Sequence, residues 1–187
     1  MGKIKRILLT IALLAIVVTF TTQGTLAYYT TTGQATNVVT SGNIRFIVHE
    51  TTDQGDEFPS EGVTVFPGAV VSKQVSFEND CEHPFYLRAK IVYSANDENL
   101  AAENCFKLDI DTQHWLLKDG WYYYNGIVEA GQTTPYLFTK AEVVGDAVNN
   151  SYIGKTLNLS VVAQALQSEN NPLTGEDVTT AAGWPQE

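Results

Sequence analysis

The stretch FYLRAKIVY, residues 85 to 93, alternates apolar and polar side chains with a period of two. Such alternation predicts a β-strand with one apolar and one polar face, because successive side chains point to opposite sides of a sheet. The pattern recurs in VSKQVSF, residues 71 to 77, and in LNLSVVAQA, residues 157 to 165. Antiparallel sheets commonly pack one face on the core and expose the other to water, which produces this alternation. The three segments therefore predict antiparallel sheet.

Shorter segments extend the β pattern along the chain. We expect strands at 44–49, 63–66, 106–110, 121–124 and 136–143, separated by turn pairs such as Pro67-Gly68 and Asn125-Gly126. DGWYYYNG, residues 119 to 126, predicts a strand within a hairpin. The result is about eight or nine short strands, which predicts an all-β, antiparallel β-sandwich.

Helix is scarce in the pattern after the N-terminal segment. One or two turns are expected at 96–105, and a short C-terminal helix at 175–183 with Asp177 or Thr174 as its cap. Trp184 is expected to pack back onto the sandwich.

The first 27 residues have the composition of a secretory signal peptide. Lys3, Lys5 and Arg6 precede an uncharged apolar run at 7–20, which is shorter than the roughly 20 residues that span a bilayer. Small residues before the end of this segment place the cleavage between Ala27 and Tyr28. The alternative is an anchor helix that stays attached to the chain.

Three regions follow from this interpretation: a signal peptide at 1–27, an extended N-terminal segment at 28–43, and a β-sandwich domain at 44–187. The whole chain carries a net charge of −10, and removal of the three basic residues takes it to −13. A secreted protein this acidic is not expected to bind nucleic acid, because phosphate contacts need clusters of Lys and Arg. No stable membrane anchor is expected after cleavage.

Cys81 and Cys105 are the two cysteines of the chain. In an exported protein they are expected to form one disulfide, and two buried free thiols are the alternative. A bridge closing a loop of this length would contribute about 3 kcal/mol.

Residues suited to catalysis or metal binding do not form a recognisable motif. His49 and Glu50 begin a zinc-protease-like pattern, but its fifth position is Asp53 rather than a histidine. Asp109 and Asp111 would share one face of a strand as a weak calcium candidate, with the acidic loop at 53–61 as the next, although a solvated charged surface is favoured for both. No nucleophile motif or phosphate loop is present, so we expect neither an enzyme nor a cofactor.

Aromatic residues between 115 and 124 form a candidate binding patch made of Trp115, Trp121 and Tyr123. Such a patch could bind a glycan, which gives an alternative function as a monomeric extracellular binding module. At strand spacing, however, aromatic residues more often divide between the core and the surface.

Several motifs, taken in order, resemble the TasA/camelysin family of exported proteins. They are the signal ending GTLA, the following YYT, ATNVVTSGNI, FPGAVVSKQVSFEND with FYLRAKI, DGWYYYNGIVEAGQTTPYLF, LSVVAQALQSEN and AAGWP. The resemblance implies a jelly-roll-like sandwich that is processed by a dedicated signal peptidase. It also implies a structural role at the cell surface or in the biofilm-matrix fibres of Gram-positive bacteria. The metalloprotease activity ascribed to part of the family is not transferred, because no residues here match a catalytic metal site.

In fibres of this kind, the segment after the cleavage site completes a sheet in the next subunit, which makes the chain its own partner. The candidate donor strand lies within residues 28–40 and includes Tyr28, Tyr29, Thr30, Thr32, Val38 and Val39. Tyr, Thr and Val favour strands, and the segment has no charge to protect its edge from pairing. The alternative is that the segment folds back on its own sheet and leaves a monomer.

Overall fold

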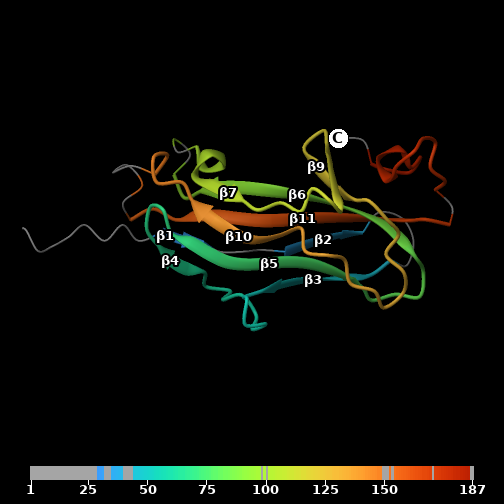
Figure 1. The fold of residues 1–187 in the computed structure, drawn as a ribbon, viewed down its shortest axis with the longest axis horizontal. Coiled ribbons are helices and arrows are strands. Elements are labelled where there is room, and N and C mark those ends of the chain that lie inside the picture. The colour runs from blue at the N-terminus through green and yellow to red at the C-terminus, as the bar shows by residue number, and fades with distance from the viewer. Residues whose placement is uncertain are drawn as a thin grey trace, which may run out of the picture.

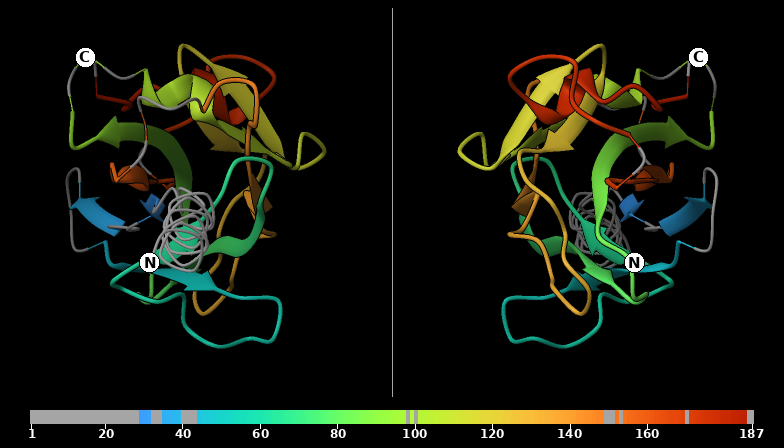
Figure 2. Two further views of the ribbon diagram at one scale, coloured as in Figure 1. Left: turned by 90° about the vertical axis from the view of Figure 1, so that its left-hand side faces the viewer. Right: turned by 90° about the vertical axis from the view of Figure 1, so that its right-hand side faces the viewer.

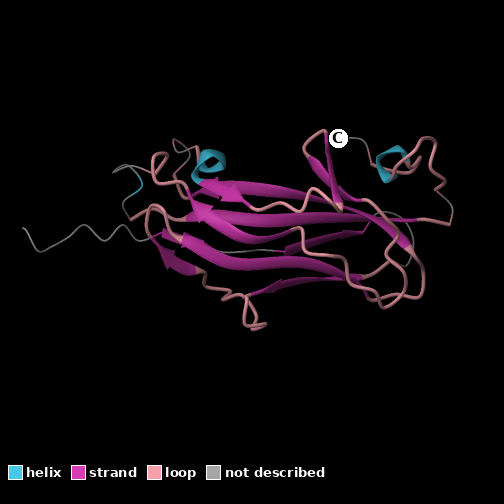
Figure 3. Cartoon of the chain, viewed as in Figure 1, coloured by secondary structure: helices cyan, strands magenta, loops and turns pink. Residues whose placement is uncertain are grey.

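The fold was analysed in a computed structural model, which describes residues 29–31, 35–39, 44–97, 99, 101–148, 152, 154–169 and 171–185. These residues form eleven strands and two short 3-10 helices, so the fold is all-β as predicted (Figures 1 and 3). The predicted signal peptide lies outside the described residues, as do Tyr28 and Thr32. No helix in the described part of the chain is long and apolar enough to cross a membrane.

Two sheets make up the body of the molecule, and a two-stranded ribbon lies beside them. The four-stranded sheet has the order β3 (Phe46–Thr51), β5 (Val70–Asn79), β10 (Phe138–Val143) and β7 (Phe106–Leu108). The five-stranded sheet has the order β2 (Ala35–Val39), β11 (Leu157–Gln167), β6 (Phe85–Ala95), β9 (Trp121–Tyr124) and β8 (Trp115–Lys118). The ribbon pairs β1 (Tyr29–Thr31) with β4 (Val63–Val65).

The long antiparallel pair of β6 and β11 is the centre of the five-stranded sheet. Its register runs without a break from Phe85 opposite Gln167 to Ala95 opposite Leu157. Leu87 faces Ala165 and Ile91 faces Val161 across this pair, so a large side chain on one strand meets a smaller one on the other. This face packs against the four-stranded sheet and forms the main core.

Aromatic rings fill the middle of that core. Phe77 lies 6.5 Å from Phe46 and 5.7 Å from Trp115, measured between ring centroids, and all three side chains are buried. Phe46 and Phe77 come from the four-stranded sheet and Trp115 from the edge of the other, so the rings join the two layers. Tilted and edge-on rings at these separations are the arrangements that aromatic pairs prefer.

The predicted hairpin is confirmed and consists of β8 and β9. Lys118 pairs with Trp121, and the turn between them is Asp119-Gly120 with φ values of 50° and 79°. Positive φ at both turn residues matches the right-handed twist of the two strands, and Asp and Gly tolerate it better than other residues.

The C-terminal segment has less helix than the sequence predicts. In place of the helix expected at 175–183, the structure has the 3-10 helix η3, Val178–Thr180. The Asp177 side chain accepts a hydrogen bond from the Thr179 backbone N–H, which is the expected cap. Thr180 Oγ1 donates to the Asp177 carbonyl at 2.6 Å, and this local bond takes a carbonyl that a longer helix would use.

Candidate functional site

The N-terminal segment pairs with two distant parts of its own chain. β1 lies antiparallel to β4, with Tyr29 opposite Val65. β2 lies parallel to β11, with Ala35 opposite Val161 and Val39 opposite Ala165. The candidate donor residues within the described part of the chain, Tyr29, Thr30, Val38 and Val39, therefore all lie in paired strands.

β2 is an edge strand, and its parallel pairing sets it apart from the antiparallel pairs that make up the rest of the described sheets. β3 is an edge strand of the four-stranded sheet, and β2 lies next to it on the same side of the sandwich, as the end views in Figure 2 show. β2 pairs with residues Val161 to Ala165 in the middle of β11. Removing it would leave the main-chain groups of this stretch unpaired, which creates a template for another strand.

The three residues of the predicted aromatic patch do not form one surface. Trp115 packs into the main core between the sheets, where its ring centroid lies 5.6 Å from that of Tyr124. Trp121 and Tyr123 point to the opposite face of the five-stranded sheet, because alternate strand residues face opposite sides. All three side chains are buried, so none of them offers an exposed ring to a glycan.

A second apolar cluster covers the outer face of the five-stranded sheet. It contains Trp121, Tyr123 and Trp184, and the C-terminal segment forms its cover. Trp184 is buried and donates from Nε1 to the Val178 carbonyl at 2.8 Å, which confirms that it packs back onto the sandwich. Arg88, on β6, lies beneath these rings.

The disulfide expected between Cys81 and Cys105 is not formed, and both are free thiols. Cys81 lies before the start of β6, whereas Cys105 precedes Phe106, which stacks on Tyr93 towards the other end of β6. The eleven residues of β6 extend for roughly 35 Å at about 3.3 Å per residue, and a disulfide needs Cα atoms within about 7 Å. The fold therefore separates the two cysteines.

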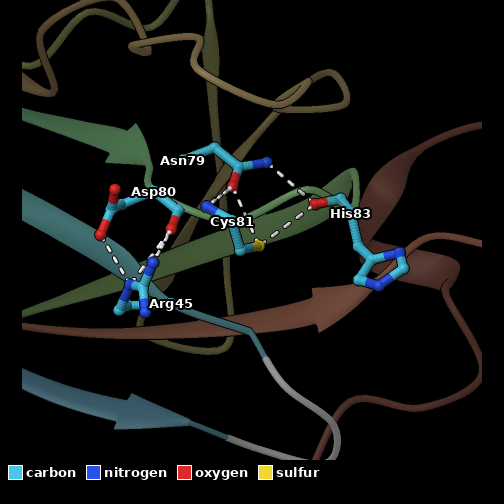
Figure 4. A network of polar contacts seen from close by, with 5 residues as sticks. All are labelled: Arg45, Asn79, Asp80, Cys81 and His83. Carbon is cyan, nitrogen blue, oxygen red and sulfur yellow. Dashed lines mark hydrogen bonds and ion pairs between the residues drawn. The ribbon is translucent and has the colours of Figure 1, made fainter.

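Cys81 belongs to a polar network at the end of β5 (Figure 4). Its backbone N–H donates to Asn79 Oδ1 at 2.9 Å, and its thiol lies 3.0 Å from the same oxygen. Asn79 Nδ2 donates to the carbonyls of His83 and Val128, each at 2.9 Å. The buried Asn79 amide therefore shapes the loop that presents Cys81, while Arg45 holds the neighbouring Asp80 at 2.6 Å.

We expect the two thiols to differ sharply in reactivity. Cys81 is partly exposed, whereas Cys105 is fully buried and burial raises the pKa of its thiol. Titration of the mature protein with Ellman's reagent is therefore expected to find about one reactive thiol in buffer and about two in denaturant. A Cys81→Ser variant serves as the control and should show none in buffer. If neither cysteine reacts in denaturant without a reductant, the thiols are oxidised and the expectation is wrong.

The weak calcium candidates lie after the end of β7 rather than on one face of a strand. The Asp109 carboxylate accepts hydrogen bonds from the backbone N–H groups of Thr139 at 2.8 Å and Lys140 at 2.6 Å. Burial by itself raises the pKa of Asp109, but the hydrogen bond from the Thr139 hydroxyl and these two backbone bonds outweigh it and hold the pKa below its usual value. The hydrogen bond from His114 lowers the pKa of Asp111.

The Asp109 carboxylate thus binds the backbone of β10, and the Asp111 carboxylate accepts hydrogen bonds within its own turn, from the backbone N–H groups of Gln113 and His114. The residues that the structure describes contain no group of three or more His, Cys, Asp or Glu that could hold a metal ion.

Two buried charged residues, Arg88 and Lys73, were not predicted as site residues from the sequence. Arg88 stands on the face of β6 that the alternation assigns to water, and its burial depends on a C-terminal segment about a hundred residues away. Lys73 forms an ion pair with Glu50 at 2.7 Å. A signal for Lys73 was present, because it occupies the same side of its strand as Val71, Val75 and Phe77.

Comparison with protein-family models gives no match for the chain, and comparison with curated proteins gives none either. The fold, its strand edges and its buried charges are therefore the observations on which a function can be proposed.

Proposed function

We propose that the chain is an exported structural protein of the cell surface or extracellular matrix, and that its copies assemble by exchange of the N-terminal strand. One observation carries the proposal: β2 joins the five-stranded sheet at an edge, through parallel pairing with the middle of β11. A strand held in this way can be replaced by the same strand of another copy, since the main-chain partners would be identical.

The connection between β2 and the rest of the sandwich supports an exchange. Six residues, 40–45, separate the end of β2 from β3, and they include Ser41-Gly42. In the exchange, β2 leaves the edge of its own β11 and pairs with β11 of a neighbour. Each copy then accepts one strand and gives one, and a head-to-tail series that does not close grows into a filament.

The more detailed features belong to the same proposal. They are a jelly-roll arrangement of the two sheets, removal of the signal peptide between Ala27 and Tyr28, and a location in a biofilm matrix. The resemblance to the TasA/camelysin family supports them, as does the uncharged character of residues 28–40. The main partner is a second copy of the chain, and no enzymatic activity is proposed.

The test compares the mature protein, beginning at Tyr28, with a version that begins at Gly42, by negative-stain electron microscopy and sedimentation. The mature protein is expected to form filaments, and the shortened one is expected to form none because it has no strand to donate. Circular dichroism of the shortened protein must first show that the sheet is retained.

A matched pair of substitutions removes the dependence on truncation. Val38→Pro removes the backbone N–H of a residue that pairs with β11 and is expected to reduce filament formation strongly. Val38→Thr keeps the strand propensity and is expected to leave filament formation intact. Filaments of equal length and number from the full and shortened proteins would exclude strand exchange.

A further inference from the structure

Arg88 is a buried charge, and its hydrogen-bond partners among the described residues are all neutral. Its side chain is 4% exposed. Nε and Nη2 donate to Gln164 Oε1 at 2.9 and 2.6 Å, Nη1 donates to the Tyr123 hydroxyl at 3.0 Å, and Nη2 donates to the Pro185 carbonyl at 2.9 Å. These bonds use four of the five N–H groups of the guanidinium.

Aromatic rings surround the same guanidinium. Its carbon atom lies 4.3 Å from the ring centroid of Trp121, 5.0 Å from that of Trp184 and 5.7 Å from that of Tyr123. Rings and neutral oxygens stabilise a cation but do not cancel its charge. Among the described residues, the ion pairs involve other side chains and none includes Arg88. Burying a charge without an opposite charge is costly, so this site favours an anion from outside.

A cavity of about 280 Å³ opens beside Arg88. Its walls include Lys118, Asp119, Tyr123, Thr179 and Trp184. Lys118 is exposed and donates from Nζ to Thr179 Oγ1 at 3.2 Å. This bond uses one of the three N–H groups of the ammonium. The cavity thus combines two cations and hydroxyl groups with the carboxylate of Asp119, and the Asp177 carboxylate lies behind Thr179 and attracts Lys118.

We propose that this cavity binds a small polyhydroxylated carboxylate, of the uronic acid class. The ligand carboxylate would lie between Arg88 and Lys118, because both supply charge-assisted N–H donors. Its hydroxyl groups would donate to the Asp119 carboxylate and to Thr179 Oγ1, which acts as an acceptor because its own hydrogen is donated to Asp177. The cavity volume is at the lower limit of small-molecule sites, which matches a single sugar ring rather than a longer chain.

The Asp119 carboxylate favours a uronate over inorganic phosphate as the ligand. A carboxylate in the wall repels a compact dianion, whereas it accepts hydrogen bonds from the hydroxyl groups of a sugar. The acidic net charge of the chain acts in the same direction, since it disfavours ligands with many negative charges. A singly charged, hydroxyl-rich ligand fits both conditions. This inference does not depend on strand exchange or on filament formation.

The three tryptophans provide the readout, because the fold puts them in two environments. Trp121 and Trp184 belong to the cluster around Arg88, whereas Trp115 is in the core between the sheets. In ¹H–¹⁵N spectra of the mature protein, titration with sodium D-glucuronate is expected to shift the indole signals of Trp121 and Trp184 and to leave that of Trp115 in place. The expected dissociation constant is on the order of 1 mM, the value for a ligand with about a dozen heavy atoms.

Controls separate the ligand classes and the residues. D-glucose, which lacks the carboxylate, and sodium phosphate at equal ionic strength are each expected to cause no saturable shift. Lys118→Gln is expected to weaken glucuronate binding about tenfold, whereas Lys107→Gln, an equal loss of charge at an exposed residue of β7, is expected to leave it unchanged. The inference is overturned if glucose and glucuronate act alike, if phosphate saturates the same signals, or if the Lys118 variant binds as well as the original.

Discussion

Glu50→Gln is expected to lower the free energy of unfolding by about 3–5 kcal/mol, because it leaves a buried lysine without its opposite charge. Lys73 Nζ lies 2.7 Å from Glu50 Oε2, and the lysine side chain is only 1% exposed. Its ammonium group also lies 4.3 Å from the centroid of the Phe58 ring, so an apolar wall takes the place of water. Urea denaturation of the mature protein at pH 7 measures this loss as a lower midpoint.

A double variant tests whether the loss comes from the unpaired charge. Glu50→Leu combined with Lys73→Met removes both charges together, and stability is expected to return to within about 1–2 kcal/mol of the original. The exposed ion pair of Arg45 and Asp80 is the control, and Asp80→Asn should cost less than about 1 kcal/mol. If Glu50→Gln costs no more than this surface change, the ion pair does not stabilise the sandwich.

The Glu50→Gln deficit is also expected to shrink as the pH rises. Burial lowers the pKa of Lys73 below its usual 10.5, and Glu50 opposes this by attraction and by its hydrogen bond. Without Glu50 the pKa falls further. Between that lower folded pKa and the unfolded pKa of about 10.4, the unfolded chain binds more protons than the folded one, so stability increases with pH. The difference in urea midpoint between the variant and the original should therefore be smaller at pH 9.5 than at pH 7.

The sandwich was predictable where one face of a strand is apolar. The segments around β5, β6 and β11 alternate clearly, and β9 has the predicted bounds. β8 was not predicted, because the sequence WLLK does not alternate: Trp115 enters the core, while the apolar Leu117 is 63% exposed. The alternation of apolar and polar residues does not identify an edge strand that exposes an apolar side chain to water.

The candidate sites were less predictable, because they depend on contacts between distant segments. The cationic cavity needs Arg88 on β6, Lys118 in the β8–β9 hairpin and Trp184 from the C-terminal segment. Trp121 and Tyr123 were predicted as members of a possible binding patch, with a division between core and surface as the favoured alternative, and nothing local indicates that the C-terminal segment covers them. The donor-strand hypothesis came from the resemblance to the TasA/camelysin family, with which the uncharged segment 28–40 agrees. Neither indicates β11 as the partner, which is more than a hundred residues away.

Asn79→Asp is expected to lower the free energy of unfolding by about 3–5 kcal/mol at pH 7, although the two side chains have the same shape. Asn79 is 1% exposed, and its Nδ2 donates to the carbonyls of His83 and Val128, each at 2.9 Å. An ionised carboxylate would place a negative oxygen against two carbonyl oxygens and leave both without a donor. Thermal and urea denaturation of the variant measure the loss.

The pH dependence and a matched control show whether the lost donor causes this effect. Burial against two carbonyls raises the pKa of the new carboxyl above the unfolded value of about 3.9, so the penalty grows as the pH rises through that range and is smallest below it. Asn96→Asp is the control. Asn96 is exposed, and its side chain accepts from the Thr156 N–H through Oδ1 at 3.0 Å, a bond that a carboxylate keeps, so the loss should stay below about 1 kcal/mol. Equal losses in the two variants, or a loss at residue 79 that does not change between pH 4 and pH 7, would show that the amide does not hold the Cys81 loop through its donor.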